Sequence, residues 1–162
     1  MPFNHFDAQG QAIMVDVSAK QPTLRTATAE ALVALSPELA AQVGSGGSAK
    51  GDVLGVARLA GIAAVKKTPD LIPLAHPLAI NHAAIEFDLI PASGRLHIRC
   101  TVRAFERTGV EMEAMTGASV AALTVYDMVK GADRSVAICG VRLLFKEGGK
   151  SGTYHREAAA GW

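Results

Sequence analysis

The sequence predicts one α+β domain with a ferredoxin-like βαββαβ fold. A chain of 162 residues is the length of a single domain. Its apolar residues follow strand and helix periods in the order strand, helix, strand, strand, helix, strand. The expected architecture is an antiparallel four-stranded sheet with two long helices on one face, plus a short extra helix. The expected organisation is one domain over 1–162, with an N-terminal arm over 1–20 and a flexible C-terminal tail over 147–162.

The arm and the first strand occupy the start of the chain. Residues 1–20 are irregular, with room for a short strand over 13–18. Residues 23–35 are rich in alanine, which allows a helix, but their side chains alternate along the segment. The threonines among them favour a strand, so a strand is predicted there.

Two helices are expected next. Ser36 is a typical N-cap and Pro37 a typical first helical residue, which predicts a short helix that the Gly-rich segment 44–48 ends. A second helix is expected over about 51–67, where small apolar residues recur at helical spacing. Its glycines would allow a close approach to a neighbouring element. Pro69 closes it.

The second half of the chain completes the pattern. Segments 83–90 and 95–105 read as strands, and the short turn 91–94 between them predicts an antiparallel hairpin. The longest helix is expected over 111–130, and a last strand over 135–145. The face of the sheet without helices needs a cover, for which the N-terminal arm is one option and a subunit interface the more natural one.

Composition limits the function classes. Hydrophobic residues make up 49% of the chain, aromatic residues 5%, and the formal net charge is +1. This balance does not indicate nucleic-acid binding, so an anionic ligand would need a local cluster of cations. No signal-like or membrane-spanning apolar run is present, and a cytoplasmic location is expected. Cys100 and Cys139 lie in apolar stretches and are expected to be reduced core residues.

Charged residues near the helix ends are the first candidates for chemistry. Lys50 follows a Gly-rich loop at a helix start, but the order is not that of a phosphate-binding loop, and a solvated surface lysine remains an alternative. Asp127 and Lys130 share one helix face and could be catalytic or an ordinary ion pair. Glu111 and Glu113 in the first turn are also explained by the helix dipole alone.

The spacing along the long helix constrains any shared site. Glu113 and Asp127 are fourteen residues apart, which places them about 21 Å apart along the axis. Within one chain they cannot serve one small reacting centre. Either the ligand is extended or a site is assembled from two subunits, and both options favour an oligomer.

The segment DLIPLAHPLAINH (70–82) holds the third candidate, His76. Ala75 and Pro77 flank it, and the proline stiffens the backbone on both sides. Packing, metal binding and substrate binding all remain open from the residues alone. Metal binding has the least support, because His76, His82 and His97 lack the spacing of a zinc site.

A set of cations is the last candidate. Lys146 and Lys150 flank two glycines, and Arg25 and Arg134 are further basic residues outside the long helices. Such a set could meet an anionic group, or the glycines could simply mark a flexible tail.

Six phrases of the sequence stand out when they are taken together and in order. They are MVDVSAK (14–20), KGDV (50–53), DLIPLAHPL (70–78), TGVEMEA (108–114), ASVAALTVYDMVK (118–130) and GGKSG (148–152). These phrases resemble the molybdenum cofactor biosynthesis protein C family, the cyclic pyranopterin monophosphate synthases. The resemblance runs from about residue 10 to residue 153.

The resemblance implies a ferredoxin-like fold assembled as a homohexamer, a trimer of dimers, with active sites at subunit interfaces. It implies a lyase that converts 3′,8-cyclo-7,8-dihydroguanosine triphosphate to cyclic pyranopterin monophosphate with release of pyrophosphate, in molybdenum cofactor biosynthesis. It implies no redox cofactor and no protein-bound metal, although a divalent ion on the triphosphate is possible. Neither a nucleic acid nor a membrane is an expected partner.

The resemblance also implies site residues. The catalytic set would be Asp127, Lys50 and Lys130. The substrate-binding set, with Arg25 added from the cation cluster, would be Leu74, Ala75, His76, Met112, Glu113, Lys146 and Arg25. This chain has Ala75 where the family often has cysteine, and Arg134 where lysine is common, which keeps the charge but changes the donor geometry.

These residues are expected to have different roles in the reaction. We expect Lys50 and Lys130 to handle proton transfer and phosphate charge, with a lysine whose pKa is lowered by cationic neighbours as a base. Asp127 would orient Lys130 or accept protons, and His76 and Glu113 would hold the guanine-derived ring.

Two other functions remain open. One is a non-catalytic nucleotide- or pterin-binding regulatory module on the same fold, since a fold does not determine a function. The other is a metal-dependent hydrolase that uses His76 and His82.

Overall fold

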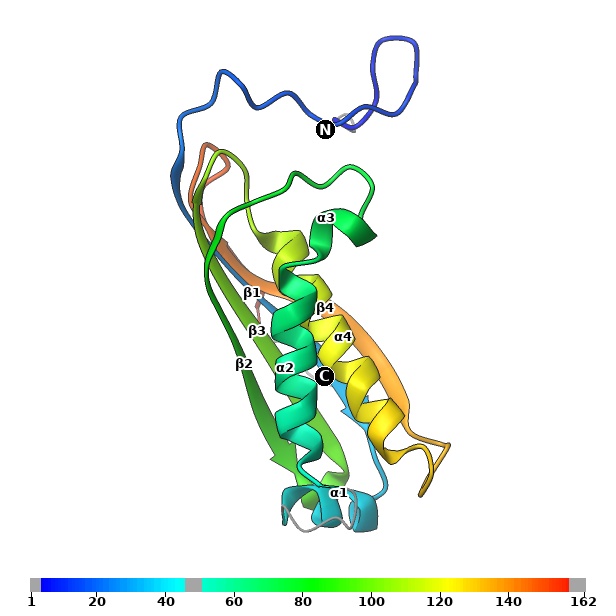
Figure 1. Ribbon diagram of the computed structural model, residues 1–162. Helices are drawn as coiled ribbons and strands as arrows, with labels where there is room; N and C mark the ends of the chain where they lie inside the picture. The colour runs from blue at the N-terminus through cyan, green and yellow to red at the C-terminus, as the bar shows by residue number, and fades with distance from the viewer. Residues whose placement is uncertain (1–3, 46–50, 158–162) are drawn as a thin grey trace.

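The structure is a computed structural model that describes residues 4–45 and 51–157. It confirms the ferredoxin-like α+β fold: a twisted antiparallel sheet carries its long helices on one face (Figure 1). The elements are β1 (Thr23–Ala34), α1 (Pro37–Gly44), α2 (Val53–Val65), α3 (Thr68–Leu71), β2 (Ile80–Ile90), η1 (Pro91–Ser93), β3 (Arg95–Glu106), α4 (Glu111–Val129), β4 (Ala137–Glu147) and β5 (Tyr154–His155).

The sheet has the strand order β2-β3-β1-β4-β5, and every neighbouring pair is antiparallel. The first four strands are those expected from the sequence. β5 is not: residues 154–155 of the expected flexible tail pair with β4, where Phe145 faces His155 and Lys146 faces Tyr154. The prediction of four strands was therefore one short, because a two-residue strand has no detectable alternation.

Two smaller expectations were wrong. Residues 13–18 form no strand, and the isolated bridge found in the described part of the arm joins Phe6 and Ala12. α2 does end before Pro69, as expected, and Pro69 then lies at the start of a separate short helix, α3. Cys139 is exposed, whereas Cys100 is buried as expected, and burial raises the pKa of the Cys100 thiol to about 12.

Local side-chain bonds begin α1 and α2 where the sequence predicts. The Ser36 hydroxyl accepts a hydrogen bond from the Leu39 amide at 3.2 Å, and the Asp52 carboxylate accepts one from the Gly55 amide at 2.8 Å. Each bond satisfies an amide that has no partner within its helix.

The core lies between the helices and the sheet and is built from small residues. Four alanines of α4 are fully buried, and they allow the helix to lie close to β1 and β3. α2 packs on α4 at two glycines: a Cβ on Gly61 would lie 2.9 Å from the Gly117 carbonyl oxygen. The four alanines are Ala114, Ala118, Ala121 and Ala122.

The other face of the sheet buries a charge. Glu30 is only 3% exposed, and its carboxylate accepts hydrogen bonds from Arg142 at 3.0 Å and from His97 at 3.1 Å, with Arg99 at 3.6 Å. The two guanidinium groups and the imidazole replace hydrogen bonds that the carboxylate has lost with water. Figure 1 shows the N-terminal arm extending past the end of the sheet, so the arm is not the cover of this face.

The two ends of the sheet carry different elements (Figure 1). We call the "arm end" the end that holds the arm (residues 4–20), α3 and the start of α4. The "α1 end" holds α1, the start of α2 and the end of α4. None of the helices in the described part of the chain has the length and apolar character needed to cross a membrane.

Gly61→Ala is expected to destabilise the protein by about 1–3 kcal/mol. The added methyl group would meet a backbone oxygen and the Ile85 side chain, both at 2.9 Å, and overpacking of this kind outweighs the gain in helix propensity of about 1 kcal/mol. Gly44→Ala is the matched control, since its methyl group would meet only the flexible end of Leu89. Chemical denaturation of both variants measures the effect. Equal free energies of unfolding for the two variants would show that α2 and α4 can move apart to admit the added methyl group.

Candidate active site

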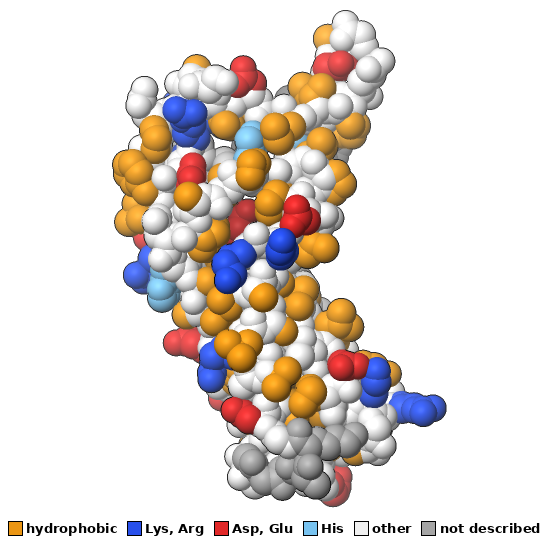
Figure 2. All heavy atoms as spheres, in the orientation of Figure 1, with side chains coloured by type: hydrophobic (Ala, Val, Ile, Leu, Met, Phe, Trp, Pro, Cys, Tyr) orange, Lys and Arg blue, Asp and Glu red, His pale blue; other side chains and the backbone are white. Residues whose placement is uncertain are grey.

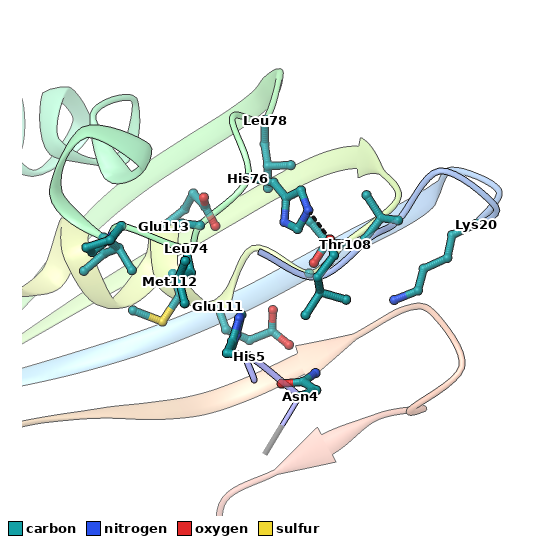
Figure 3. A pocket seen from close by; sticks show the side chains of 16 residues that line it. Asn4, His5, Lys20, Leu74, His76, Leu78, Thr108, Glu111, Met112 and Glu113 are labelled. Carbon is teal, nitrogen blue, oxygen red and sulfur yellow. Dashed lines mark hydrogen bonds between the residues drawn. The ribbon is translucent and has the colours of Figure 1, made fainter. Parts of the chain in front are cut away.

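A cavity of about 630 Å³ opens at the arm end. Three segments that are far apart in the sequence form its walls (Figure 3). They are the arm, the loop between α3 and β2, and the turn that leads into α4. The lining residues are Asn4, His5, Val15, Val17 and Lys20 from the arm, residues 72–76 and Leu78 from the loop, and Thr108, Gly109 and residues 111–113 from the turn and α4.

The loop between α3 and β2 is held at both of its ends. At its start the Ala75 amide bonds to the Ile72 carbonyl at 3.0 Å, which makes a tight turn. At its end the Ala79 amide donates to the Glu106 carboxylate at 3.1 Å. Two prolines stiffen the segment between these bonds, as the sequence predicts. Leu74, Ala75 and His76 are therefore presented to the cavity on a restrained backbone.

His76 joins the loop to the arm. Its Nε2 lies 2.7 Å from the carbonyl oxygen of Val15, and the backbone carbonyl accepts the hydrogen bond, so Nε2 carries the proton (Figure 3). That bond leaves Nδ1 for a ligand. The rigid polar group predicted from the sequence is thus also the contact that holds the arm against the pocket.

Glu113 supplies a buried carboxyl group at the start of α4. The residue is 3% exposed, and burial, with a smaller contribution from Glu111, raises the pKa of Glu113 to about 7. Its own backbone amide opposes this shift. Near neutral pH the group is therefore balanced between an acceptor and a proton donor.

Asp127 and Lys130 lie at the α1 end, far from this pocket. They form an exposed pair, with Lys130 Nζ 2.5 Å from Asp127 Oδ1, which is the intrahelical pairing that the sequence left open. The hydrogen bond and charge of Asp127 raise the pKa of Lys130. This direction is opposite to that expected for a general base, and within one chain it keeps Lys130 a cation. Lys50 lies outside the described residues, two positions before the Asp52 cap of α2.

Arg25 and Lys146 lie at the arm end but not in the lining of the pocket. The Arg25 guanidinium donates to the backbone carbonyls of Glu106 and Arg107 at 3.1 and 3.2 Å. It also lies so close to Gly149 that a side chain there would collide with it. Arg25, in β1, thus holds the turn before α4 through two backbone carbonyls and lies close to Gly149. The ammonium of Lys146 bonds to the Ser151 hydroxyl.

The structure therefore brings together one part of the predicted site and separates the other. Leu74, Ala75, His76, Met112 and Glu113 line one cavity. Sequence reasoning missed the arm as a wall of that cavity, although the phrase MVDVSAK contains three of its lining residues: Val15, Val17 and Lys20.

The metal-binding alternative has no cluster to support it. In residues 4–45 and 51–157 no three His, Cys, Asp or Glu side chains gather closely enough to hold an ion. His76 bonds to the arm, and His82 stands in the edge strand β2, as expected for an ordinary strand residue.

Fold and site together define the class: a ferredoxin-like α+β domain with a pocket for a small molecule at one end of its sheet. The MoaC family model matches residues 14–149, and the chain belongs to the MoaC family.

Relatives match nearly the whole chain. A cyclic pyranopterin monophosphate synthase of Geobacter sulfurreducens is 70% identical over 157 residues, which cover 97% of this chain and 98% of the relative. The synthase of Pelobacter propionicus is 69% identical with the same coverage. The synthase of Cereibacter sphaeroides is 53% identical over 154 residues, or 95% of this chain and 97% of the relative.

Glu113→Gln is expected to stabilise the protein increasingly as the pH rises. In the wild type the folded state holds its proton up to about pH 7, whereas the unfolded carboxyl loses it near 4.5, so stability is lost between these values. The variant should gain little at pH 4 and about 1–2 kcal/mol at pH 8, after allowance for water in the open pocket. Denaturation at several pH values measures it. A carbon-13 titration of Glu113 with a midpoint near 4.5 would contradict the burial argument.

Proposed function

We propose that this protein is a cyclic pyranopterin monophosphate synthase. It would convert 3′,8-cyclo-7,8-dihydroguanosine triphosphate to cyclic pyranopterin monophosphate and pyrophosphate, as a lyase of molybdenum cofactor biosynthesis. The observation that carries the proposal is the identity of 69–70% over nearly the full length to proteins of that name. The pocket at the arm end, with five of the expected binding residues, supports it.

The pocket suits the ring system of such a substrate. A guanine-derived ring presents N–H groups on one edge, and carboxylates are their natural acceptors. Glu111 and Glu113 place two carboxyl groups on the α4 wall, while Leu74, Ala75 and Met112 offer apolar contact to the ring faces. His76 adds one nitrogen, at Nδ1, on the opposite wall.

The phosphate chemistry needs more cations than the one lysine, Lys20, that lines this pocket in the described part of the chain. Closing a cyclic monophosphate means that a sugar hydroxyl attacks the α-phosphorus and that the bond to the leaving pyrophosphate breaks. Cations favour this step because they stabilise negative charge on the departing group. Lys130, kept protonated by Asp127, and Lys50 are the proposed cations, with a divalent ion on the triphosphate as a possible addition.

Two subunits would bring these groups together. Glu113 and Asp127 are about 21 Å apart along the axis of α4, so one chain cannot place both on one reacting centre. We propose that the α1 end of one subunit meets the arm end of another in a homohexamer, a trimer of dimers. Exposed apolar side chains on the helix face support association (Figure 2), among them Val56, Leu59 and Leu123.

The proposed location is the cytoplasm.

Lys130→Met is expected to abolish turnover without changing the melting temperature. The pair with Asp127 is exposed, and exposed pairs contribute little to stability. A cation on the leaving group is worth a factor of 100 or more, on the order of an oxyanion-hole donor. Pyrophosphate release from the cyclised triphosphate measures activity, with Lys67→Met, another exposed lysine paired at i,i+3, as the control. A wild type that binds the substrate without releasing pyrophosphate would instead indicate a non-catalytic binding module.

Mixed oligomers test the shared site. His76→Ala damages the pocket and Asp127→Asn damages the α1 end, so each variant alone should show little turnover. Coexpressed in equal amounts, they should regain about a quarter of the wild-type activity, because about a quarter of the sites then pair an intact pocket with an intact α1 end. Lack of any recovery in confirmed hetero-oligomers would show that each site belongs to one chain.

A further inference from the structure

The tip of the N-terminal arm is folded and not a loose end. Its amides at positions 9 and 11 donate to the Asp7 carboxylate at 2.9 and 2.8 Å. Phe6 pairs with Ala12 as an antiparallel bridge, and the Ile13 amide donates to the His5 carbonyl at 3.0 Å. These bonds make a small hairpin that turns the chain back, so that His5 lies beside Ile13.

The base of this hairpin is fixed to the pocket. The Val15 carbonyl accepts the hydrogen bond from His76 at 2.7 Å. Directly after it, the Ser18 amide and hydroxyl both donate to Asp16, at 2.8 and 2.6 Å, and hold the backbone in a turn. The arm is therefore anchored two residues beyond Ile13, which limits how far the hairpin can swing away from the pocket.

This construction places Asn4 and His5 in the pocket wall. Both line the same cavity as Glu111 and Met112 (Figure 3). Both are exposed, and among the described residues neither side chain has a hydrogen-bond or ion-pair partner. Neither belongs to the segment that the family model matches, which begins at residue 14.

The polar groups of the cavity are divided between two sides. The α4 side offers the carboxyl groups of Glu111 and Glu113, which accept hydrogen bonds from N–H groups. The arm offers donors: the Asn4 amide, the His5 imidazole and the Lys20 ammonium. A ligand with N–H groups on one edge and oxygen acceptors on another would be oriented by this division.

We propose that the arm is a permanent wall of the substrate pocket and that His5 contacts an oxygen acceptor of the bound substrate, so that it contributes to specificity. The identity of the substrate in this inference rests on the proposed function. The existence of a contact between His5 and a bound ligand does not. His5 acts in binding, and the hairpin built on Asp7 acts as a positioning element for it.

Kinetics of His5→Ala test the proposal. Loss of one hydrogen bond made equally in the ground and transition states should raise KM about five- to tenfold and leave kcat within twofold. His5→Gln keeps a donor and should recover part of the loss. Asp7→Ala loosens the hairpin and should raise KM in the same direction, whereas Gln9→Ala, at the exposed tip and outside the pocket, should change nothing.

Equilibrium binding separates this proposal from the proposed function. Binding of GTP, a stable triphosphate with a guanine edge, is measured for the wild type and the same variants by calorimetry. If the wild type binds GTP but never turns over the cyclised substrate, the proposed function fails, while weaker binding by His5→Ala would still support the contact. If His5→Ala and Asp7→Ala match the wild type in both KM and GTP affinity, the arm is not a wall of the site and the inference is overturned.

Discussion

The close contact between α2 and α4 is the constraint on which the rest of the structure depends. Gly61 and Gly117 have no side chains, so the backbones of α2 and α4 come into direct contact there. The fully buried alanines of α4 likewise allow that helix to lie close to the sheet. In a close-packed core of small residues, the two helices cannot tilt or slide against each other without a steric clash. The position of α4 therefore determines where both of its functional ends lie.

α4 therefore holds a buried carboxyl group and an exposed ion pair at a fixed distance from each other. Its first turn brings Glu113 into the wall of the cavity at the arm end, where burial raises the pKa of the carboxyl group to about 7. Its last turn presents Asp127 and Lys130 to solvent, where their pairing keeps the lysine charged. A helix cannot bend these ends together. An extended, polyanionic substrate with a hydrogen-bonding ring is the kind of ligand that such a division suits, and a second subunit is the simplest way to supply the missing half.

The pocket itself depends on contacts between segments that have no regular structure. The loop at 72–79 is stiffened by prolines and fixed by Glu106, and Arg25 of β1 holds the turn before α4 through the carbonyls of Glu106 and Arg107. His76 connects the loop to the arm. Each contact is a single hydrogen bond or a pair of them to a backbone group, so the walls of the pocket are set by a few side chains whose removal would loosen it locally without unfolding the sheet.

The sequence by itself determined the four main strands, the long helices and the Ser36 cap of α1, because alternation, helical spacing and capping residues are local signals. It also identified Leu74, Ala75, His76, Met112 and Glu113 through the family phrases. Only the tertiary structure decided that these five share a cavity, that Arg25 is occupied by backbone carbonyls and that the arm forms a wall. It also added β5, which pairs with β4. These facts depend on contacts between distant segments, and no periodicity within a segment encodes which partner it will meet.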